Sequence, residues 1–224
     1  MAAAYLLSLG YRSIAYVAGT HRGLVWSQNR FTGAQQAVER SERCEIRLWS
    51  LEVDNIEQIQ TGDTYANKIA PWITRLAGRS SDPIHQLSAD ACNQQPFKHQ
   101  LAMYESGMEK QLLPLFKQIL GWRACTAWLC QNDMVALMAV DFLRTSGIHV
   151  PADISVMGFD NLLESHNRRL SSYSFNPEAA IRRLLATVLG NPHYLLVRSG
   201  TPLAEPGYVV ERDTTATART VFSD

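Results

Sequence analysis

Short apolar runs alternate along this chain with segments of helical periodicity, and several of the runs end in polar side chains. The clearest pair is Thr126–Cys130 and Ile154–Gly158, which are followed by the polar positions 131–133 and 160–161. A helical pattern lies between the two runs. Short apolar runs separated by helices are typical of parallel strands that are buried on both faces. The pattern therefore predicts a parallel βαβ unit with its polar groups at the carboxyl ends of the strands.

The same alternation extends over most of the chain. Gly10 and Gly147 follow helical stretches at positions suited to a left-handed cap, and Asn176 with Pro177 is a favoured helix start. The expected helices are 2–9, 27–40, 103–120 with a kink or early break at Pro114, 133–146 and 177–190. The expected strands or extended segments are 13–18, 44–51, 126–130, 154–158, 170–175 and 208–212. This order predicts an α/β protein with a doubly wound parallel sheet and right-handed crossovers.

Composition narrows the class of protein. The chain has 224 residues, a formal net charge of zero, and 46% hydrophobic and 19% charged residues, as expected for a globular protein with a substantial core. Nothing in the overall charge favours nucleic acid or an anionic membrane, and the arginine pairs 168–169 and 182–183 are expected to be solvated. No apolar run reaches the ~18 residues of a membrane span, and no basic leader opens the chain, so a cytoplasmic location is expected.

No pattern typical of a catalytic, metal or cofactor site stands out. His149 and His166 do not fall in a metal-ligand spacing, and neither a Cys-x-x-Cys motif nor a phosphate loop occurs. The irregularly spaced cysteines are expected to be structural thiols rather than disulfides or metal ligands. They are Cys44, Cys92, Cys125 and Cys130.

The polar groups at the strand ends are the candidate binding residues, because ligands of open α/β sheets bind outside the carboxyl ends of the strands. Asp160 either accepts hydrogen bonds from ligand hydroxyls or caps the turn that follows it. Asn132 and Asp133 stand at a strand-to-helix junction, where both residue types are favoured caps. We expect one of them, Asp133, to cap the helix and the other to face the ligand, although either could contact it.

Several segments resemble the ligand-binding core of the lactose/galactose repressor family, which shares its fold with periplasmic sugar-binding proteins. The specific part is Val150-Pro-Ala-Asp-Ile-Ser-Val-Met-Gly-Phe-Asp-Asn161 in register with Gln131-Asn-Asp133; residues 3–19, 27–33 and 206–215 also match. The resemblance implies a transcription regulator, not an enzyme. Such a protein would bind a sugar or related effector between two lobes, dimerise, need no cofactor, and make no contact with a membrane.

The resemblance also assigns residues to the site. It implies that Asp160 contacts the ligand and that Arg30 is the effector-binding arginine, whose planar fork suits a pair of hydroxyls or a carboxylate. The alternative for Arg30 is a solvated helix position. Trp26 would offer either a stacking face or a packing aromatic ring. The family's stacking aromatic falls near Ala102, which cannot stack, so Tyr104 or Phe97 would have to replace it.

The resemblance implies a division into lobes as well. Residues 1–12 and 162–215 would be remnants of the N-terminal lobe, 13–161 would form the C-terminal effector-binding lobe with an atypical insertion at 52–104, and 216–224 would be a frayed tail. The chain begins where the family's first lobe is nearly finished. DNA contact is therefore expected only through a helix-turn-helix module outside this chain, which is either a fragment, a mis-started reading frame or a protein that completes the lobe differently.

Three alternatives remain open at this point. A transport-type sugar-binding protein would have the same core, an enzyme would place turnover on the same sheet, and a degenerate paralogue would keep only a dimerisation surface.

Overall fold

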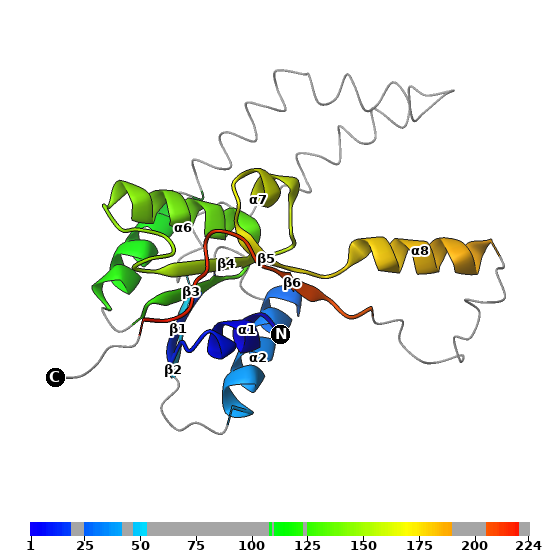
Figure 1. The fold of residues 1–224 in the computed structure, drawn as a ribbon, viewed down its shortest axis with the longest axis horizontal. Coiled ribbons are helices and arrows are strands. Elements are labelled where there is room, and N and C mark those ends of the chain that lie inside the picture. The colour runs from blue at the N-terminus through cyan, green and yellow to red at the C-terminus, as the bar shows by residue number, and fades with distance from the viewer. Residues whose placement is uncertain are drawn as a thin grey trace, which may run out of the picture. The chain divides into compact units, whose positions relative to one another are not determined.

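The computed structural model describes residues 1–18, 25–41, 47–52, 108, 110–122, 125–189 and 205–219. Residues 1–52 and 115–224 belong to one compact unit, in which helices cover both faces of a sheet (Figure 1). The predictions for Cys44, Cys92 and residues 53–104, with Phe97 and Ala102 and also Tyr104 among them, lie outside the described residues.

The helices and strands agree closely with those expected from the sequence. The helices are α1 (Ala2–Ser8), α2 (Val25–Glu39), α6 (Asp133–Thr145), α7 (Leu163–Asn167) and α8 (Pro177–Val188). The strands are β1 (Ser13–Ala18), β2 (Arg47–Glu52), β3 (Ala127–Cys130), β4 (Ser155–Phe159), β5 (Ser171–Ser174) and β6 (Tyr208–Val210). Only α7 was not anticipated, because its five residues are too few to show a helical period.

Residues 110–121 form a further helix that runs through Pro114, so the early break expected there is wrong. The helix continues although proline lacks the backbone N–H that would extend the ladder. Leu115, Phe116 and Ile119 follow the proline and are all buried. Burial of this apolar face compensates for the missing hydrogen bond, since packing contributes most of the stability of helices in proteins.

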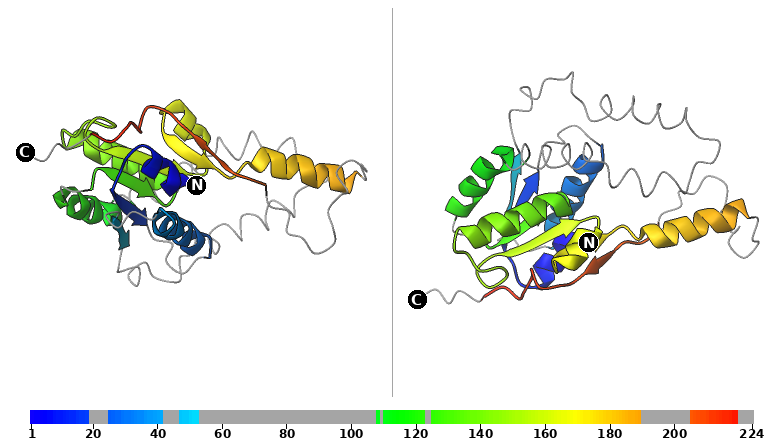
Figure 2. Two further views of the ribbon diagram at one scale, coloured as in Figure 1. Left: turned by 60° about the horizontal axis from the view of Figure 1, so that its bottom comes forward. Right: turned by 90° about the horizontal axis from the view of Figure 1, so that it is seen from above.

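The strands form one sheet in the order β2-β1-β3-β4-β5-β6. The first five strands are parallel, and β6 is antiparallel to β5. In Figure 1, α6 lies above the sheet and α1 and α2 lie below it, and the view from above in Figure 2 shows α6 crossing the sheet's face. The predicted α/β class with a parallel sheet covered on both faces is confirmed.

Alternate residues of the central strands fill two separate cores. Tyr16, Leu129 and Met157 belong to the core that α1 and α2 cover. The intervening residues, such as Trp128 and Val156, are also fully buried. Because the two faces of each strand are both apolar, the strands read in the sequence as continuous runs rather than as an alternating pattern.

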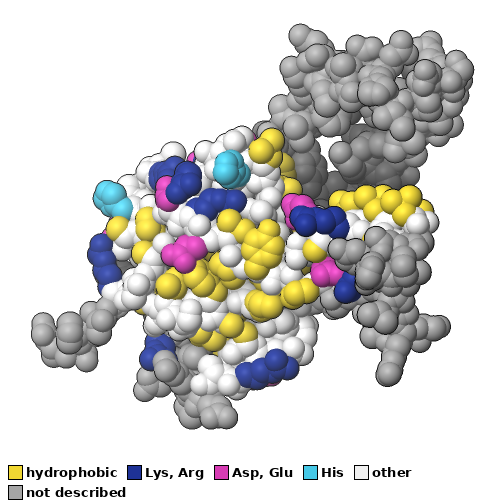
Figure 3. Space-filling model, turned by 45° about the vertical axis from the view of Figure 1, so that its right-hand side comes forward, with side chains coloured by type: hydrophobic (Ala, Val, Ile, Leu, Met, Phe, Trp, Pro, Cys, Tyr) yellow, Lys and Arg dark blue, Asp and Glu magenta, His cyan; other side chains and the backbone are white. Residues whose placement is uncertain are grey.

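The division into lobe remnants stays a prediction, but the segments assigned to the N-terminal lobe pack largely on the same sheet as residues 13–161. Helix α1 buries Ala2, Ala3 and Leu6 in the same core as β1, β3 and β4, and β5 and β6 extend the same sheet. Apolar side chains next to a sheet are stabilised by packing on it, which joins residues 1–12 and much of 162–215 to residues 13–161. Helix α8 differs, because its large apolar side chains are exposed (Figure 3).

The expectation of a frayed tail is wrong as far as residue 218. Thr214 is buried, and its Oγ1 donates to Val156 O at 2.8 Å. Beyond it, Ala216 N donates to Ser155 Oγ at 3.1 Å and Ala218 N donates to Leu9 O at 2.8 Å. These backbone hydrogen bonds hold the segment along the strand ends of the sheet. Residues 220–224 lie outside the described residues.

Candidate functional site

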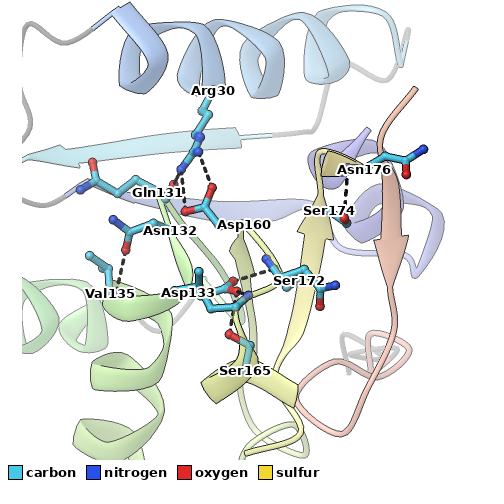
Figure 4. Close-up of polar contacts among 12 residues, drawn as sticks. Arg30, Gln131, Asn132, Asp133, Val135, Asp160, Ser165, Ser172, Ser174 and Asn176 are labelled. Atoms are coloured by element: carbon cyan, nitrogen blue, oxygen red, sulfur yellow. Dashed lines mark hydrogen bonds and ion pairs between the residues drawn. The ribbon is translucent and has the colours of Figure 1, made fainter. Parts of the chain in front are cut away.

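The carboxyl ends of β3 and β4 are neighbours in the sheet, because the two strands pair in parallel with Leu129 opposite Met157. This register brings Gln131, Asn132 and Asp133 close to Asp160, as Figure 4 shows. Helix α2 crosses above them and carries Arg30. The topology thus brings Asn132, Asp133 and Asp160 to one edge of the sheet, as the βαβ pattern implied, and α2 adds Arg30.

Arg30 and Asp160 form a two-pronged ion pair at this edge. Arg30 Nη2 donates to Asp160 Oδ1 at 2.5 Å, and Nη1 donates to Oδ2 at 3.3 Å. Nη1 also donates to the carbonyl oxygen of Gln131 at 2.6 Å. The side chains of Arg30 and Asp160 are 13% and 30% exposed. A paired fork of this kind is stronger and better oriented than a hydrogen bond between neutral groups.

Aromatic rings lie against the flat guanidinium of Arg30. Its Cζ atom is 4.6 Å from the ring centre of Trp26, 4.9 Å from that of Phe175 and 5.4 Å from that of Phe159. Phe175 also meets Tyr173 edge-on, with ring centres 5.1 Å apart. A cation over an aromatic face is attracted to it, most strongly where water is excluded. The guanidinium thus donates to oxygens and lies within cation–π distance of three aromatic rings.

A cavity of about 430 Å³ opens beside this cluster, within the usual range of small-molecule sites. Its wall is formed by Trp26, Asn29, Arg30, Gly33 and Ala34 of α2, by Phe159, Tyr173 and Phe175, and by Met1, Ala2 and Ala3. Of the predicted site residues, Arg30 and Trp26 line the wall, whereas Asp160 and Asn132 do not. Asp160 contacts Arg30, which lines the cavity, but Asp160 itself is not part of the wall.

Asp133 is not on the cavity surface. It is fully buried, and its carboxylate accepts hydrogen bonds from Leu162 N at 2.8 Å, Ser165 Oγ at 2.6 Å and Ser172 Oγ at 2.6 Å. Burial raises the pKa of this carboxyl above its ordinary value, against the opposing effect of the same hydrogen bonds. Protein groups contact both oxygens of Asp133 in this arrangement, and its contact with a ligand stays a prediction.

Asn132, and not Asp133, caps α6. Its Oδ1 accepts from Val135 N at 2.9 Å, and its backbone is extended as N-cap residues usually are. The cap of α6 is therefore Asn132 and not Asp133, which is the opposite of the expectation. The reason is the position of Asp133 one residue further on, where its side chain turns inward between β4 and β5.

Apart from Trp26, the aromatic part of the site was missed by sequence reasoning. Phe159 stands directly before Asp160 in the matching motif, and Tyr173 and Phe175 alternate along the segment that contains β5. Their order in the sequence equally fits core packing, and only the structure brings them to Arg30. Asp160 and Asn161 also have positive φ angles of 101° and 51°. Such angles are rare for residues other than glycine, and no sequence motif predicted them.

The other residues considered from the sequence lie elsewhere or are structural. His149 pairs with Asp153 in an exposed contact at 3.1 Å. Arg168 pairs with Asp141, and Arg169 pairs with Asp213 at 3.0 Å. Cys125 and Cys130 are buried free thiols, as expected. Within the described residues, no helix is long and apolar enough to cross a membrane, and no group of acidic, histidine or cysteine side chains could hold a metal ion.

Comparison with known proteins places this arrangement in a family. Residues 66–215 match the family described as periplasmic binding protein-like domain. The regulator MalR of Streptomyces coelicolor is 34% identical over 113 residues, which are 47% of this chain and 31% of that protein. The repressor PurR of Aliivibrio fischeri is 41% identical over 58 residues, which are 26% of this chain and 15% of that protein.

Solved structures of regulators have the same fold. A dimeric Lac repressor matches with a TM-score of 0.56 and 21% identity over 97% of this chain and 60% of that one. A LacI family regulator of Enterococcus faecium with bound ribose matches with a TM-score of 0.57 and 16% identity over 97% of this chain and 62% of that one.

This chain therefore spans about a third or less of the curated relatives and about three fifths of the solved neighbours. The resemblance to lactose/galactose-type regulators is confirmed by these matches. Because the family match covers more than half of the chain and includes β3 to β6, this chain belongs to the family of periplasmic binding protein-like domains.

Proposed function

We propose that this chain is the effector-sensing core of a LacI-type transcription regulator and that it binds a small polar molecule, a sugar, beside Arg30. The single observation that carries the proposal is the Arg30–Asp160 fork set among aromatic rings at the wall of a cavity. A sugar presents pairs of hydroxyls that a carboxylate and a guanidinium can bind, and an apolar ring face that packs on an aromatic side chain.

The comparisons support a sensor more than a transporter or an enzyme. The matched relatives are named as helix-turn-helix regulators, and one structural neighbour holds ribose. In such a regulator a ligand shifts an equilibrium between two conformations only by binding one of them more tightly. The proposal therefore includes a homodimer, a cytoplasmic location, and contact with DNA through a helix-turn-helix module of the kind named in the relatives.

The proposal can be tested by calorimetry on the full chain with D-ribose, D-galactose, D-glucose and maltose at millimolar concentration, with adenosine as a nucleoside probe. A ligand that binds only the folded state raises its stability, by about 2.7 kcal/mol at a hundredfold excess over Kd. We expect at least one sugar to bind. Absence of binding across the whole panel would overturn the proposal, and turnover of a sugar would indicate an enzyme instead.

The residue-level test uses two matched Arg–Asp pairs. Asp160→Asn keeps a residue type that tolerates a positive φ angle but removes the carboxylate, so sugar affinity should fall about tenfold or more, as for a lost hydrogen bond to a charged group. Asp141→Asn removes the same group from the surface pair with Arg168. This control should bind like the wild type. Equal affinity of wild type and Asp160→Asn would count against a ligand at this pair.

A further inference from the structure

Asp133, at the start of α6, is hydrogen-bonded to the start of α7 and to β5. Through Leu162 N and Ser165 Oγ its Oδ2 holds the start of α7, and through Ser172 Oγ its Oδ1 holds β5. Ser172 Oγ in turn accepts from the backbone N–H of Asn161 at 3.0 Å. The buried carboxylate is thus linked, directly or through one hydroxyl, to the two backbone N–H groups that follow Asp160 (Figure 4).

The turn held in this way is a strained one. Asp160 and Asn161 both have positive φ angles, and residues in such conformations persist only where the surroundings fix them. The backbone N–H of Asp160 donates to Tyr173 O at 2.9 Å, and Arg212 Nη2 donates to Asn161 Oδ1 at 2.6 Å. These contacts fix the turn from the β5 side, and Asp133 fixes it from the side of α6.

We infer that Asp133 is a positioning residue for the Arg30–Asp160 pair: its carboxylate holds the turn of residues 160–162 in the conformation that aims Asp160 at Arg30. The consequence for ligand binding rests on the function proposed above. The positioning itself does not, because the ion pair is a property of the chain alone.

The shape of the interior supports a carboxylate at this position. Three donors, one N–H and two O–H groups, converge on two oxygens, which suits a side chain that only accepts hydrogen bonds. An amide would turn an NH₂ group toward at least one of these donors. Gly158 of β4 leaves the space that the carboxylate fills, since a Cβ atom there would lie 2.3 Å from Asp133 Oδ1.

The two serines offer a matched pair of variants that separates positioning from general stability. Ser165 and Ser172 are both fully buried, and each donates one hydrogen bond to the same carboxylate. Only Ser172 also accepts from Asn161 N. Ser172→Ala therefore removes a link to the strained turn, whereas Ser165→Ala removes a link to α7.

The experiment measures the ion pair without any ligand. In NMR spectra a guanidinium held by two carboxylate oxygens rotates slowly and gives separate Nη–H signals, and amide exchange reports on the N–H groups of Asn161 and Leu162. We expect Asp133→Asn to merge the Arg30 Nη–H signals and to speed both amides about tenfold or more, as for a lost hydrogen bond to a charged group. Ser172→Ala should change the Arg30 signals and the Asn161 amide in the same direction.

Ser165→Ala should leave the Arg30 signals as in the wild type, even if the protein unfolds at a lower temperature. Wild-type Arg30 signals in both Asp133→Asn and Ser172→Ala would overturn the inference. If Asp133→Asn does not fold, Ser172→Ala against Ser165→Ala decides it alone. Calorimetry with D-ribose adds the functional readout: failure of the wild type to bind would count against the sugar proposal, while the Arg30 signals would still test the positioning.

Discussion

The ends of β3 and β4 carry the same kinds of side chain, an amide and a carboxylate in adjacent positions, yet the two ends differ in what these groups contact. At the end of β3, Asn132 caps α6 and the carboxylate of Asp133 is sealed in the interior. At the end of β4, Asp160 is partly exposed and pairs with Arg30 across the sheet edge. The comparison shows that similar polar strand ends are either buried in the fold or left partly exposed, according to what covers them.

We expect the largest effect on the end of β3 from Gly158→Ala, because this substitution removes the space that the Asp133 carboxylate occupies. A Cβ atom would lie 2.3 Å from Asp133 Oδ1 and 3.0 Å from its Cα, so backbone as well as side chain must move. We expect a loss of about 3 kcal/mol or more in the free energy of unfolding, measured by urea denaturation.

Gly33→Ala is the matched control for Gly158→Ala. No atom lies within 4 Å of a Cβ placed at Gly33 of α2. Because alanine favours helix, this variant should be unchanged or more stable by up to about 1 kcal/mol. Equal stability of Gly158→Ala and the wild type would mean that the interior of the β3 end is not tightly packed around Asp133.

Asp133→Asn tests how the burial of Asp133 makes the free energy of unfolding depend on pH. The pKa of Asp133 is raised in the folded protein, first by burial. A raised pKa means that this group's stabilisation is fully present below its unfolded value of 3.8 and is lost as pH rises through the folded value. The asparagine variant does not titrate there, and we expect it to lose about 2 kcal/mol through unsatisfied buried donors.

The difference in unfolding free energy between wild type and Asp133→Asn should therefore be larger near pH 4.5 than near pH 8. Urea denaturation of both proteins at the two pH values measures it. A difference that instead grows toward pH 8 would show that the hydrogen bonds from Ser165, Ser172 and Leu162 outweigh burial and that the carboxyl has a lowered pKa in the folded protein.

The smallest expected effect belongs to the cap at the end of β3. Asn132→Ala removes the acceptor for Val135 N and should cost about 1 kcal/mol. Asn132→Asp keeps an acceptor at the helix start and should change the unfolding free energy by less than about 0.5 kcal/mol. Thermal unfolding of the two variants checks the difference. If alanine and aspartate are equivalent, Asn132 does not act mainly as a cap.

The elements of the fold were predictable because their signals are local. Apolar runs of four to six residues fixed β1, β3 and β4 nearly to the residue, and glycine after α1 and after Thr145-Ser146 marked two helix ends. The antiparallel β6 and the ordered tail were harder. Strand β6 pairs with β5, which lies more than thirty residues earlier in the chain, and Ala216 of the tail donates to Ser155, 61 residues away. No short-range pattern indicates such pairing.

Part of the candidate site was predicted from the sequence and part was not. Arg30 and Asp160 came from a resemblance in their motifs, and the structure brings them within 2.5 Å of each other. The role of Asn132 as the cap in place of Asp133 depends on which side chain turns inward, and so does the approach of Phe159 and Phe175 to Arg30. A shift of a single residue reverses the side-chain direction on a strand and turns it by about 100° on a helix.

By itself, the sequence determined the alternation of strands and helices, the parallel sheet and the presence of polar groups at the ends of β3 and β4, since each depends on the apolar period and on neighbouring residues. The tertiary structure alone decided which of those polar groups stays accessible. That outcome depends on burial. The carboxylate of Asp133 accepts from three donors in the interior, in the space left by Gly158. The carboxylate of Asp160, at the edge of the sheet, pairs instead with Arg30, which lines the cavity.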